Sequence, residues 1–413
     1  MNVRSARRLL SSLLPPRAEP GWRVRLWDGT ELASETAPAF TLHVRHPSAL
    51  ERVAGDPSMG FGEAYVAGHL DVEGDLGALL GLAYREDLFA RLSPLKKARL
   101  CWWHLRGRSG LRRARREISH HYDRGNEFYR LWLDEGLNYS CAYFETPETD
   151  LETAQRAKNA LVLRKAGLRP GHRLLDVGCG WGSLLLAAAE TPGVRALGIT
   201  LSERQLELAR ERIRRAGAAD RVEVRLADYR ELDPGRDGPF DRVVSVGMFE
   251  HVGRRNIPVF FERVRRLLKP RGLFLLHTIG RILPRETDPW IRAHIFPGGY
   301  IPALVEILPA AERAGFDFLD LENLRRHYHR TLGHWIERFE ARSGEIAGRM
   351  GEAFVRMWRL YLHGSRAAFG EGDLHLFQLL YSRGRREDLP LTRRHFYEAA
   401  EGGFPPHPAA ASP

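Results

Sequence analysis

The stretch that most constrains this chain is 173–183, which reads RLLDVGCGWGS. It opens with an apolar run of the length of a buried strand, in which Asp176 is the one acidic residue. Three glycines follow in G-x-G-x-G spacing, Gly178, Gly180 and Gly182. An apolar helical pattern then covers 184–190. A strand, a glycine turn and a helix in this order predict an α/β fold whose backbone approaches a nucleotide-like ligand.

The glycine spacing distinguishes between classes of ligand. It lacks the third glycine position of the dinucleotide fingerprint G-x-G-x-x-G. An acidic residue, Asp176, precedes the glycines, and the pattern D-x-G-x-G-x-G resembles the first motif of S-adenosylmethionine-dependent methyltransferases. A tight strand-to-helix turn without any ligand is the alternative. We expect a cofactor site at this turn.

Composition narrows the setting of the protein. The 413 residues allow one large or two ordinary domains, and the net charge of +11 favours an anionic partner: nucleic acid, a membrane surface or an acidic substrate. A simple bias toward arginine would give the same charge. Three cysteines, Cys101, Cys141 and Cys179, argue against a disulfide framework and indicate a reducing compartment. No apolar run reaches transmembrane length and no signal peptide is evident, so we expect a cytoplasmic protein with peripheral membrane contact.

Residues 1–90 predict a small α+β domain of their own. We expect an amphipathic helix within 1–20 and strands at 22–27 and 40–44. Over 48–90 we expect helices broken at Gly60, Gly62 and Gly68. Our interpretation is that this domain docks the protein on a lipid surface.

The segment 91–117 mixes cations with Trp102 and Trp103 and is interpreted as a linker. Its basic residues are Arg91, Lys96, Lys97, Arg99, Arg106, Arg108, Arg112, Arg113, Arg115 and Arg116. Cations beside tryptophans suit an anionic bilayer surface, because the rings lie among the headgroups and the cations meet lipid phosphates. The same mixture suits single-stranded nucleic acid, and a solvated helix between domains is the third interpretation. After this linker we expect a larger domain over 118–403 and a disordered tail over 404–413.

Strands and helices alternate after residue 172. Strands are expected near 173–177, 194–199, 222–226, 241–246 and 273–277, and helices near 182–190, 203–217 and 256–269. This alternation predicts a mostly parallel sheet with helices on both faces. Two more strands are expected at 316–321 and 374–380. Between them 333–369 is expected to be helical, with its regularly spaced aromatic residues in the core.

The ends of these strands carry the candidate polar residues, because ligands of an open parallel sheet bind at the carboxyl ends of its strands. This rule selects 176–182, 200–205, 227–229, 247–251 and 277–280. The last two segments contribute Glu250, His251 and His277. Each of these residues could be structural when taken alone. Together with Asp176 they indicate a polar site along one rim.

Longer stretches resemble the cyclopropane fatty-acid synthase family. The resemblance spans roughly residues 20–385 and is carried by 62–74, 118–126, 139–144, 176–182, 245–252, 276–280, 295–300, and His327-Tyr328 with Thr331. It implies a class I, Rossmann-like methyltransferase fold with S-adenosylmethionine as cofactor. It also implies transfer of a methylene unit to the cis double bond of an unsaturated phospholipid acyl chain.

In this family the alkene carbon attacks the sulfonium methyl group, and a carbocation results. A base, thought to be bound bicarbonate, then removes a proton as the ring closes. Since an alkene is a poor nucleophile, proximity and exclusion of water must supply much of the rate. A small buried anion suits this chemistry because it acts as a base and also offsets the positive charge.

The resemblance implies a cage for bicarbonate and a wall beside it. Glu250 would accept from its hydroxyl, His277 and Tyr328 would donate to its oxygens, and the backbone at Cys141 and Ile279 would complete the cage. Tyr122 would line the same pocket. A cysteine in a methyltransferase could also be a covalent nucleophile. No basic side chain near Cys141 in sequence suggests a thiolate, so we interpret it as buried pocket wall.

The residues implied for cofactor binding are Tyr139, Ser140, Asp176, Gly178, Gly180, Thr200, Ser202, Gln205, Asp228 and Tyr229. Many methyltransferases end the second strand with an acidic residue for the ribose hydroxyls. Here that end reads GITLS, so Thr200, Ser202 and Gln205 would take this role. Asp228 and Tyr229 would hold the edge and face of adenine. Ser202 could equally cap the following helix.

Other readings stay open at this point. We expect no metal site, because the pairs His120-His121 and His327/His329 lack a completing thiolate or carboxylate. A relative that methylates the double bond without closing a ring is the alternative enzyme, and a nucleic-acid methyltransferase is a weaker one, since no RNA-binding module is recognisable. A catalytically silent lipid-binding protein would have no evident use for Glu250, His277 and Tyr328. The sequence does not decide between phospholipid and carrier-bound substrates, and a homodimer is left open.

Overall fold

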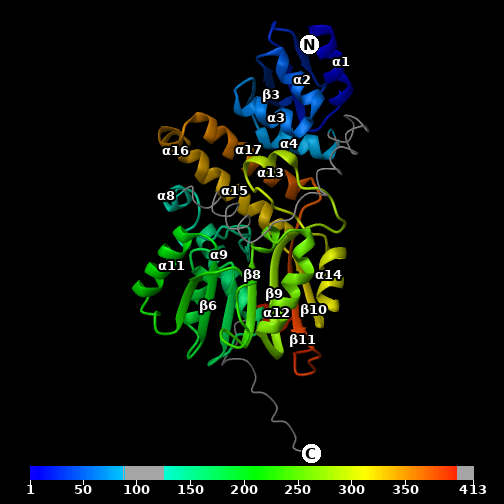
Figure 1. The fold of residues 1–413 in the computed structure, drawn as a ribbon. Helices are drawn as coiled ribbons and strands as arrows, with labels where there is room; N and C mark the ends of the chain where they lie inside the picture. The colour runs from blue at the N-terminus through cyan, green and yellow to red at the C-terminus, as the bar shows by residue number, and fades with distance from the viewer. Residues whose placement is uncertain (87, 89–124, 398–413) are drawn as a thin grey trace, which may run out of the picture.

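The computed structural model describes residues 1–86, 88 and 125–397. The linker 91–117, the residues His120, His121 and Tyr122, and the tail 404–413 lie outside the described residues. The predictions made for them therefore stay predictions. Figure 1 shows the N-terminal domain, in blue, at one end of a larger α/β body.

The N-terminal domain contains a four-stranded sheet and helices, and only its α+β character was predicted. Its strands are β1 (Gly21–Arg25), β2 (Glu31–Ala33), β3 (Pro38–Val44) and β4 (Leu70–Gly74). Their order is β2-β1-β3-β4, with β1 and β3 parallel and the two outer pairs antiparallel. The helices are α1 (Val3–Leu13), α2 (Pro47–Gly55), α3 (Pro57–Val66) and α4 (Leu76–Arg85). The helix within 1–20 and the strands β1 and β3 are confirmed, whereas β2 and β4 were not predicted.

The prediction that glycines break the helices over 48–90 is wrong for Gly60 and Gly62, which lie inside α3. A Cβ atom on Gly60 would lie 2.2 Å from the carbonyl oxygen of Arg52, and one on Gly62 would lie 2.3 Å from the indole of Trp290. These glycines therefore permit close packing rather than ending a helix. Gly68 does follow the helix, with φ of +74°. The chain then enters β4, where the sequence had predicted helix.

The larger body contains a seven-stranded sheet in the order β10-β11-β9-β8-β5-β6-β7. The five strands β9-β8-β5-β6-β7 pair in parallel, and β11 and β10 continue the sheet in antiparallel pairing at the β9 side. The strands are β5 (Arg173–Val177), β6 (Arg195–Thr200), β7 (Val222–Leu226), β8 (Phe240–Val246), β9 (Leu268–Gly280), β10 (Phe316–Asn323) and β11 (His375–Arg383). Every predicted strand of this sheet is confirmed, and β9 is longer than predicted.

Helices bury both faces of this sheet. They are α9 (Leu151–Lys165), α10 (Ser183–Ala189), α11 (Glu203–Arg215), α12 (Ile257–Leu267) and α14 (Leu304–Arg313). Along β5, Leu174 belongs to the core formed with α9, α10 and α11, whereas Leu175 and Val177 belong to the core formed with α12 and α14. Because successive strand residues face opposite sides, a sheet covered twice needs a continuous apolar run. For this reason the apolar run at 173–177 predicted β5 correctly.

A helical layer separates the sheet from the N-terminal domain (Figure 1). It contains α15 (Arg325–Ala341), α16 (Ser343–Met350) and α17 (Glu352–Gly370), so the helical prediction for 333–369 is confirmed. Its aromatic residues Trp335, Phe339, Trp358 and Tyr361 are buried in the core, as predicted. Shorter elements are α8 (Asn126–Arg130), η1 (Phe249–His251), η2 (Arg254–Asn256), α13 (Pro289–His294) and α18 (Arg394–Tyr397).

The N-terminal domain is fastened to the larger body through α3 and α4, which pack on α13 and α17. Arg356 of α17 donates to the carbonyl oxygens of Tyr65 and Leu70 at 2.7 and 2.8 Å. Ser58 of α3 donates to a carboxylate oxygen of Asp288 at 2.5 Å. Hydrogen bonds with one charged partner are stronger than neutral ones, so these contacts help to hold the two domains together.

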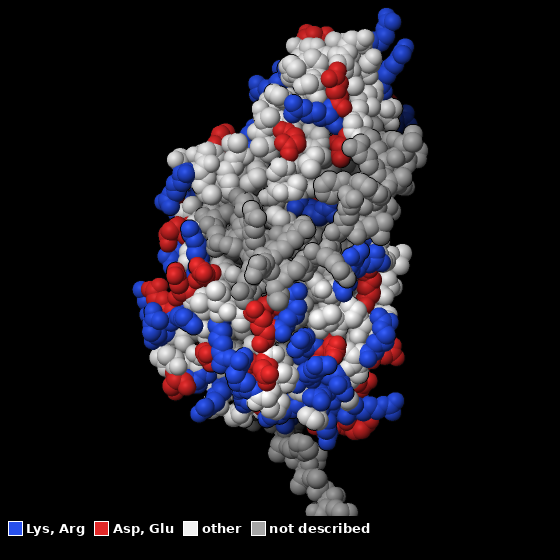
Figure 2. All heavy atoms as spheres, viewed as in Figure 1, with Lys and Arg blue, Asp and Glu red and all other residues white. Residues whose placement is uncertain are grey.

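The surface in Figure 2 interleaves Lys and Arg side chains with Asp and Glu side chains over the larger body. On this face the positive net charge of the chain is not gathered into one patch. Within 1–86, 88 and 125–397, no helix has both the length and the apolar character needed to cross a membrane.

Candidate active site

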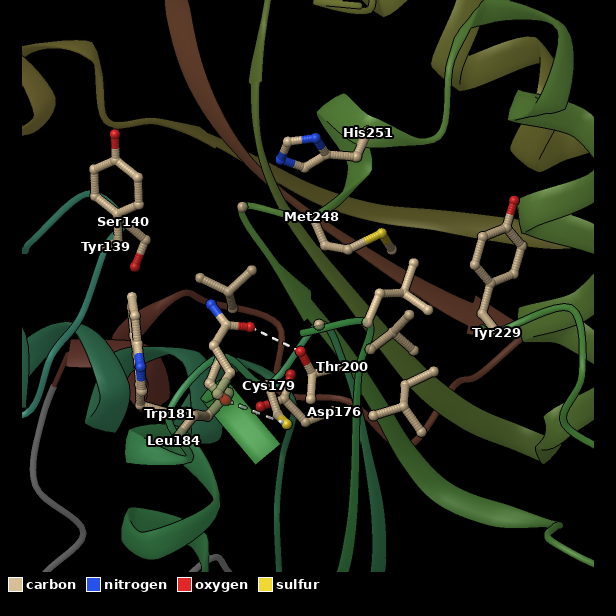
Figure 3. Close-up of a pocket in the computed structure, with 18 of the residues that line it drawn as sticks. Tyr139, Ser140, Asp176, Cys179, Trp181, Leu184, Thr200, Tyr229, Met248 and His251 are labelled. Carbon is tan, nitrogen blue, oxygen red and sulfur yellow. Dashed lines mark hydrogen bonds between the residues drawn. The ribbon is translucent and has the colours of Figure 1, made fainter. Parts of the chain in front are cut away.

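The glycine turn between β5 and α10 forms one side of a cavity at the carboxyl ends of β5, β6 and β8 (Figure 3). Gly178, Gly180 and Gly182 have φ values of +90°, +53° and +83°, a region that side-chain-bearing residues rarely adopt. A Cβ atom on Gly178 would also lie 2.5 Å from the Cβ atom of Met248. The turn thus requires glycine for its conformation and for its close approach to the neighbouring loop.

Nine of the ten residues expected to bind the cofactor line this first cavity: Tyr139, Ser140, Asp176, Gly178, Gly180, Thr200, Gln205, Asp228 and Tyr229. In Figure 3, Tyr139 and Trp181 lie on one side of it, Tyr229 lies on the other, and Asp176 and Thr200 lie toward its floor. Ser202 is the exception. Its hydroxyl accepts from the Gln205 backbone N–H at 3.3 Å as the N-cap of α11, and it is not among the lining residues. The structure therefore supports the capping role for Ser202.

The floor of the first cavity carries an unpaired carboxylate oxygen. Asp176 is 2% exposed, and its Oδ1 atom has no hydrogen-bond partner within the part of the chain that the structure describes. Burial raises the pKa of Asp176 to about 7, and the nearby Lys158 partly offsets this rise. A buried acceptor without a partner costs free energy unless a ligand supplies a donor. Asp176 is therefore placed to receive a polar group of a bound cofactor.

Lys158 of α9 is a residue of this site that the sequence reasoning missed. Its ammonium donates to the side-chain oxygens of Asn138 and Ser140, each at 3.2 Å, and it lines the first cavity. Burial lowers its pKa to about 8. One signal was available, because Gln155 and Lys158 lie on the buried face of α9, where apolar residues are expected. Gln155 donates to the Ser140 carbonyl oxygen at 2.9 Å, so α9 holds the 138–140 segment against the cavity.

Polar partners inside the protein already engage two other predicted cofactor residues. The carboxylate of Asp228 accepts from the Arg230 guanidinium at 2.8 and 2.7 Å. The hydroxyl of Thr200 donates to the Gln205 side-chain oxygen at 2.7 Å, as the dashed line in Figure 3 marks. The hydroxyl of Tyr229 is buried and has no hydrogen-bond partner in the described part of the chain. The Tyr229 ring forms an edge contact with Phe260 at 5.2 Å, which fixes it as a wall.

A second cavity adjoins the first one and shares Tyr139, Ser140, Gly247 and His251 with it. Its walls are mostly apolar. The larger body contributes Trp290, Phe296, Ile301, Leu332, Leu360 and Phe369 among others, and the N-terminal domain contributes Ser58, Phe61, Gly62, Leu80 and Tyr84. The cavity therefore lies between the two domains. No sequence pattern indicated that residues of the N-terminal domain reach this cavity.

The polar residues expected around the base gather at this second cavity. Cys141, Glu250, His277, Ile279 and Tyr328 all line it, although they come from widely separated parts of the chain. Tyr122, the sixth residue of the predicted set, lies outside the described residues. The remaining five are brought together as the resemblance implied.

Two buried polar atoms of this cluster are left available for a ligand. Glu250 accepts from the Ile279 backbone N–H at 2.6 Å through Oε1, while its Oε2 atom has no hydrogen-bond partner in residues 1–86, 88 and 125–397. His277 pairs with the Gln378 amide at 3.1 Å through Nδ1, while its Nε2 atom has no partner in the same described ranges. Burial raises the pKa of Glu250 to about 7 and lowers that of His277 well below its ordinary value, so the imidazole is neutral. The cavity thus offers one carboxyl oxygen and one imidazole nitrogen to a small polar group.

Cys141 has the environment of a wall residue. It is 0% exposed, and its thiol donates to the Ala142 carbonyl oxygen at 3.2 Å. Burial raises its pKa far above the ordinary thiol value, which opposes formation of the thiolate that a nucleophile requires. His327, which was weighed as part of a metal pair, accepts from the Phe144 backbone N–H at 3.0 Å and stacks on Tyr143. Among the described residues, no three His, Cys, Asp or Glu side chains are grouped as metal ligands would be.

Comparison with known proteins agrees with this geometry. Residues 109–379 match a family model described as mycolic acid cyclopropane synthetase, and residues 9–91 match one described as a domain of unknown function. The chain is 38% identical to a probable fatty acid methyltransferase of Pseudomonas putida, over 91% of this chain and 96% of that protein. It is also 38% identical to the cyclopropane-fatty-acyl-phospholipid synthase of Escherichia coli strain K12, over 87% of this chain and 91% of that protein.

Among solved structures, mycolic acid cyclopropane synthase CmaA1 complexed with SAH and CTAB matches with a TM-score of 0.61 and 34% identity, covering 65% of this chain and 98% of that chain. This match shows that the chain has the fold of a class I methyltransferase, as the sequence predicted. The protein belongs to the S-adenosylmethionine-dependent cyclopropane fatty-acid synthase family.

Proposed function

We propose that this enzyme forms cyclopropane rings on the cis double bonds of unsaturated phospholipid acyl chains, with bicarbonate as the base. The observation that carries the proposal is the junction of the two cavities at Tyr139, Ser140, Gly247 and His251. The cavity bounded by the glycine turn meets a second, mostly apolar cavity there, so a cofactor and an acyl chain can meet away from water.

The first cavity fits S-adenosylmethionine, which supplies the methyl group. The positive-φ glycines let backbone approach the ligand, and the unpaired Oδ1 atom of Asp176 offers an acceptor to one of its donors. The rest of this cavity is lined by Tyr139, Ser140, Thr200 and Gln205. Asp228 and Tyr229 lie at its opposite end, where they would hold the adenine ring of the cofactor. Ser202 acts on this site indirectly, by capping α11.

The second cavity fits an acyl chain along its apolar walls and bicarbonate at its polar cluster. Bicarbonate would supply the base for the proton of the new methyl group. Glu250 Oε2 would accept a hydrogen bond from the bicarbonate hydroxyl, and His277 Nε2 would donate one to a bicarbonate oxygen, with Tyr328 beside them. Because burial raises the pKa of Glu250 to about 7, the carboxyl group and the anion can share one proton instead of holding two adjacent negative charges. The buried Cys141 thiol completes the wall.

The test is turnover by the purified full-length protein given S-adenosylmethionine, bicarbonate and vesicles of cis-unsaturated anionic phospholipid. Product acyl chains are examined by proton NMR, because a cyclopropane and a methylene branch have the same mass. Upfield ring protons are expected. Vinylidene protons would instead identify the branching relative, and unmodified lipid with the cofactor still bound would contradict the choice of acceptor, after which nucleic acid and carrier-bound acyl chains would be tried.

We further propose that the protein works as a peripheral enzyme on the inner face of the membrane. The basic, tryptophan-containing segment 91–117 and the N-terminal domain would hold it there, and the N-terminal domain also forms part of the acyl cavity. Binding to anionic vesicles is expected to exceed binding to neutral vesicles and to weaken with salt. Equal affinity for both kinds of vesicle would contradict this attachment.

A further inference from the structure

Three polar side chains form a buried row across the antiparallel edge of the large sheet. The register pairs Glu322 of β10 with Gln378 of β11, and Gln378 with His277 of β9. Directly opposed residues place their side chains on the same face, so the three are neighbours. Gln378 and His277 are 1% and 0% exposed. Burying polar side chains costs free energy unless their atoms form hydrogen bonds. The hydrogen bonds of this row therefore indicate how each side chain is oriented.

A lysine from α9 fixes the direction of this row. The ammonium of Lys165 forms an ion pair with Glu322 and donates to the Gln378 side-chain oxygen at 2.8 Å. The Lys165 side chain is 1% exposed, so water does not compete for these bonds. An ammonium group has donors and no acceptor. It therefore requires the carbonyl oxygen of the Gln378 amide, and the amide nitrogen is turned toward His277.

The amide in turn selects one tautomer of the imidazole. The Gln378 nitrogen lies 3.1 Å from His277 Nδ1, and because this nitrogen donates, Nδ1 must accept. A neutral imidazole carries its single proton on the other nitrogen, Nε2. Nε2 is buried and has no hydrogen-bond partner among the described residues, and His277 lines the second cavity. The N–H at Nε2 is thus the donor that the cavity presents.

We propose that Gln378, oriented by Lys165, is a positioning residue that holds His277 with its proton on Nε2, so that the active site presents a donor to the oxygen of a small anion. This inference rests on the proposed function, since it assigns how that site recognises its base. With the proton on Nδ1 instead, Nε2 would present a lone pair and repel an anion. Glu322 balances the charge of Lys165 at the far end of the row.

The first test measures the tautomer and does not depend on activity. Two-dimensional ¹H–¹⁵N spectra of the full-length protein, labelled with ¹⁵N-histidine, report which ring nitrogen is protonated, and a His277→Gln sample assigns the signals. In the wild type, Nε2 of His277 is expected to be protonated and Nδ1 bare. In Gln378→Glu, the carboxylate can only accept, so Nδ1 is expected to become protonated in either charge state of the ring. A bare Nδ1 in this variant would overturn the proposal.

The second test separates positioning from general damage. Gln378→Met keeps the length of the side chain and removes the amide, and we expect the KM for bicarbonate to rise about tenfold while the KM for S-adenosylmethionine is unchanged. Tyr381→Phe is the matched control, because Tyr381 lies on the same strand and its buried hydroxyl has no hydrogen-bond partner among the residues that the structure describes. It should change neither KM value nor the His277 tautomer.

The outcomes distinguish this inference from the proposed function. A wild type that forms no cyclopropane but shows the expected tautomers would contradict the function and support the positioning. A wild type that is active, together with Gln378→Met of unchanged KM for bicarbonate, would overturn the positioning and leave the function intact.

Discussion

The two cavities meet at Tyr139 and Gly247 but are built in different ways. The first depends on one contiguous turn, 178–182, together with short segments at neighbouring strand ends. The second is assembled from the N-terminal domain, the helical layer and the rim of the sheet. A local motif can shape the first cavity because strand and helix geometry place its backbone. The second cavity exists only because the two domains pack together. We therefore expect that residues in its walls can be substituted without loss of the cofactor site.

The largest expected difference between the two cavities is for Glu250→Gln, which should affect turnover and leave cofactor binding unchanged. We expect turnover to fall about 10²- to 10³-fold, because the carboxylate at the polar cluster is lost from a water-excluded site. The affinity for S-adenosylmethionine, measured by calorimetry, should stay within about twofold. A matching loss of cofactor affinity would show that the two cavities are not independent.

The same variant should remove the pH dependence of stability that Glu250 causes in the wild type. The folded-state pKa of Glu250 is raised to about 7 by burial, so the folded wild type binds more protons than the unfolded chain between about pH 4.5 and 7. Its stability therefore falls as pH rises through this window, by about 3 kcal/mol at most. Glu250→Gln should melt at a higher temperature than the wild type at pH 8, and this advantage should vanish near pH 4.

The second prediction concerns the turn of the first cavity. In Gly178→Ala the residue would be strained at φ of +90°, and its Cβ atom would lie 2.5 Å from Met248. We expect cofactor binding to weaken about 10- to 100-fold, in line with about 1–3 kcal/mol of strain. Gly171→Ala is the control, because Gly171 has φ of +77° and nothing within 4 Å of the added atom. Equal weakening in both variants would mean that backbone strain alone is responsible.

The third prediction addresses the contact between domains. Gly62→Ala adds a methyl group 2.3 Å from the Trp290 indole, which lines the second cavity. Turnover on vesicles should drop about tenfold with unchanged cofactor affinity, since the α3 wall must shift. Gly55→Ala, with nothing within 4 Å, is the control and should retain activity. Full activity of Gly62→Ala would show that the N-terminal wall is dispensable for turnover.

The fourth prediction is the pH dependence of cofactor binding. Burial raises the pKa of Asp176 to about 7, so part of this carboxyl group is protonated at neutral pH when the cavity holds no ligand. If a cofactor donor needs the ionised form, affinity should improve about tenfold from pH 6 to pH 8 and then level off. Asp176→Asn should bind weakly with a flat profile. A wild-type profile that is flat over this range would exclude Asp176 as the titrating acceptor.

The smallest effect is expected for Ser202→Ala. Loss of the N-cap bond to Gln205 should lower the free energy of unfolding by about 1 kcal/mol, measured with denaturant. Cofactor affinity should change less than twofold, because Ser202 is outside the cavity lining. A loss of affinity greater than tenfold would restore Ser202 to the binding residues.

Much of the catalytic fold could be predicted because it depends on local patterns. The run at 173–177 and the glycines after it specified a buried strand and its turn, and the strand-end rule then selected Glu250, His251 and His277. The errors came from packing. Gly60 and Gly62 looked like helix breakers, yet they lie inside α3, because close contacts with α2 and Trp290 need small residues there. Lys158 and Gln378 carried no motif of their own.

By itself, the sequence determined the parallel sheet, the cofactor turn and the rim on which the polar residues lie. These follow from hydrophobic period, glycine conformation and strand polarity, which act over a few residues. Only the tertiary structure decided that the N-terminal domain walls the second cavity and that Lys165 and Gln378 stand behind His277. These contacts join residues more than a hundred positions apart, for example |i−j| of 101 between His277 and Gln378, and only packing and sheet register bring them together.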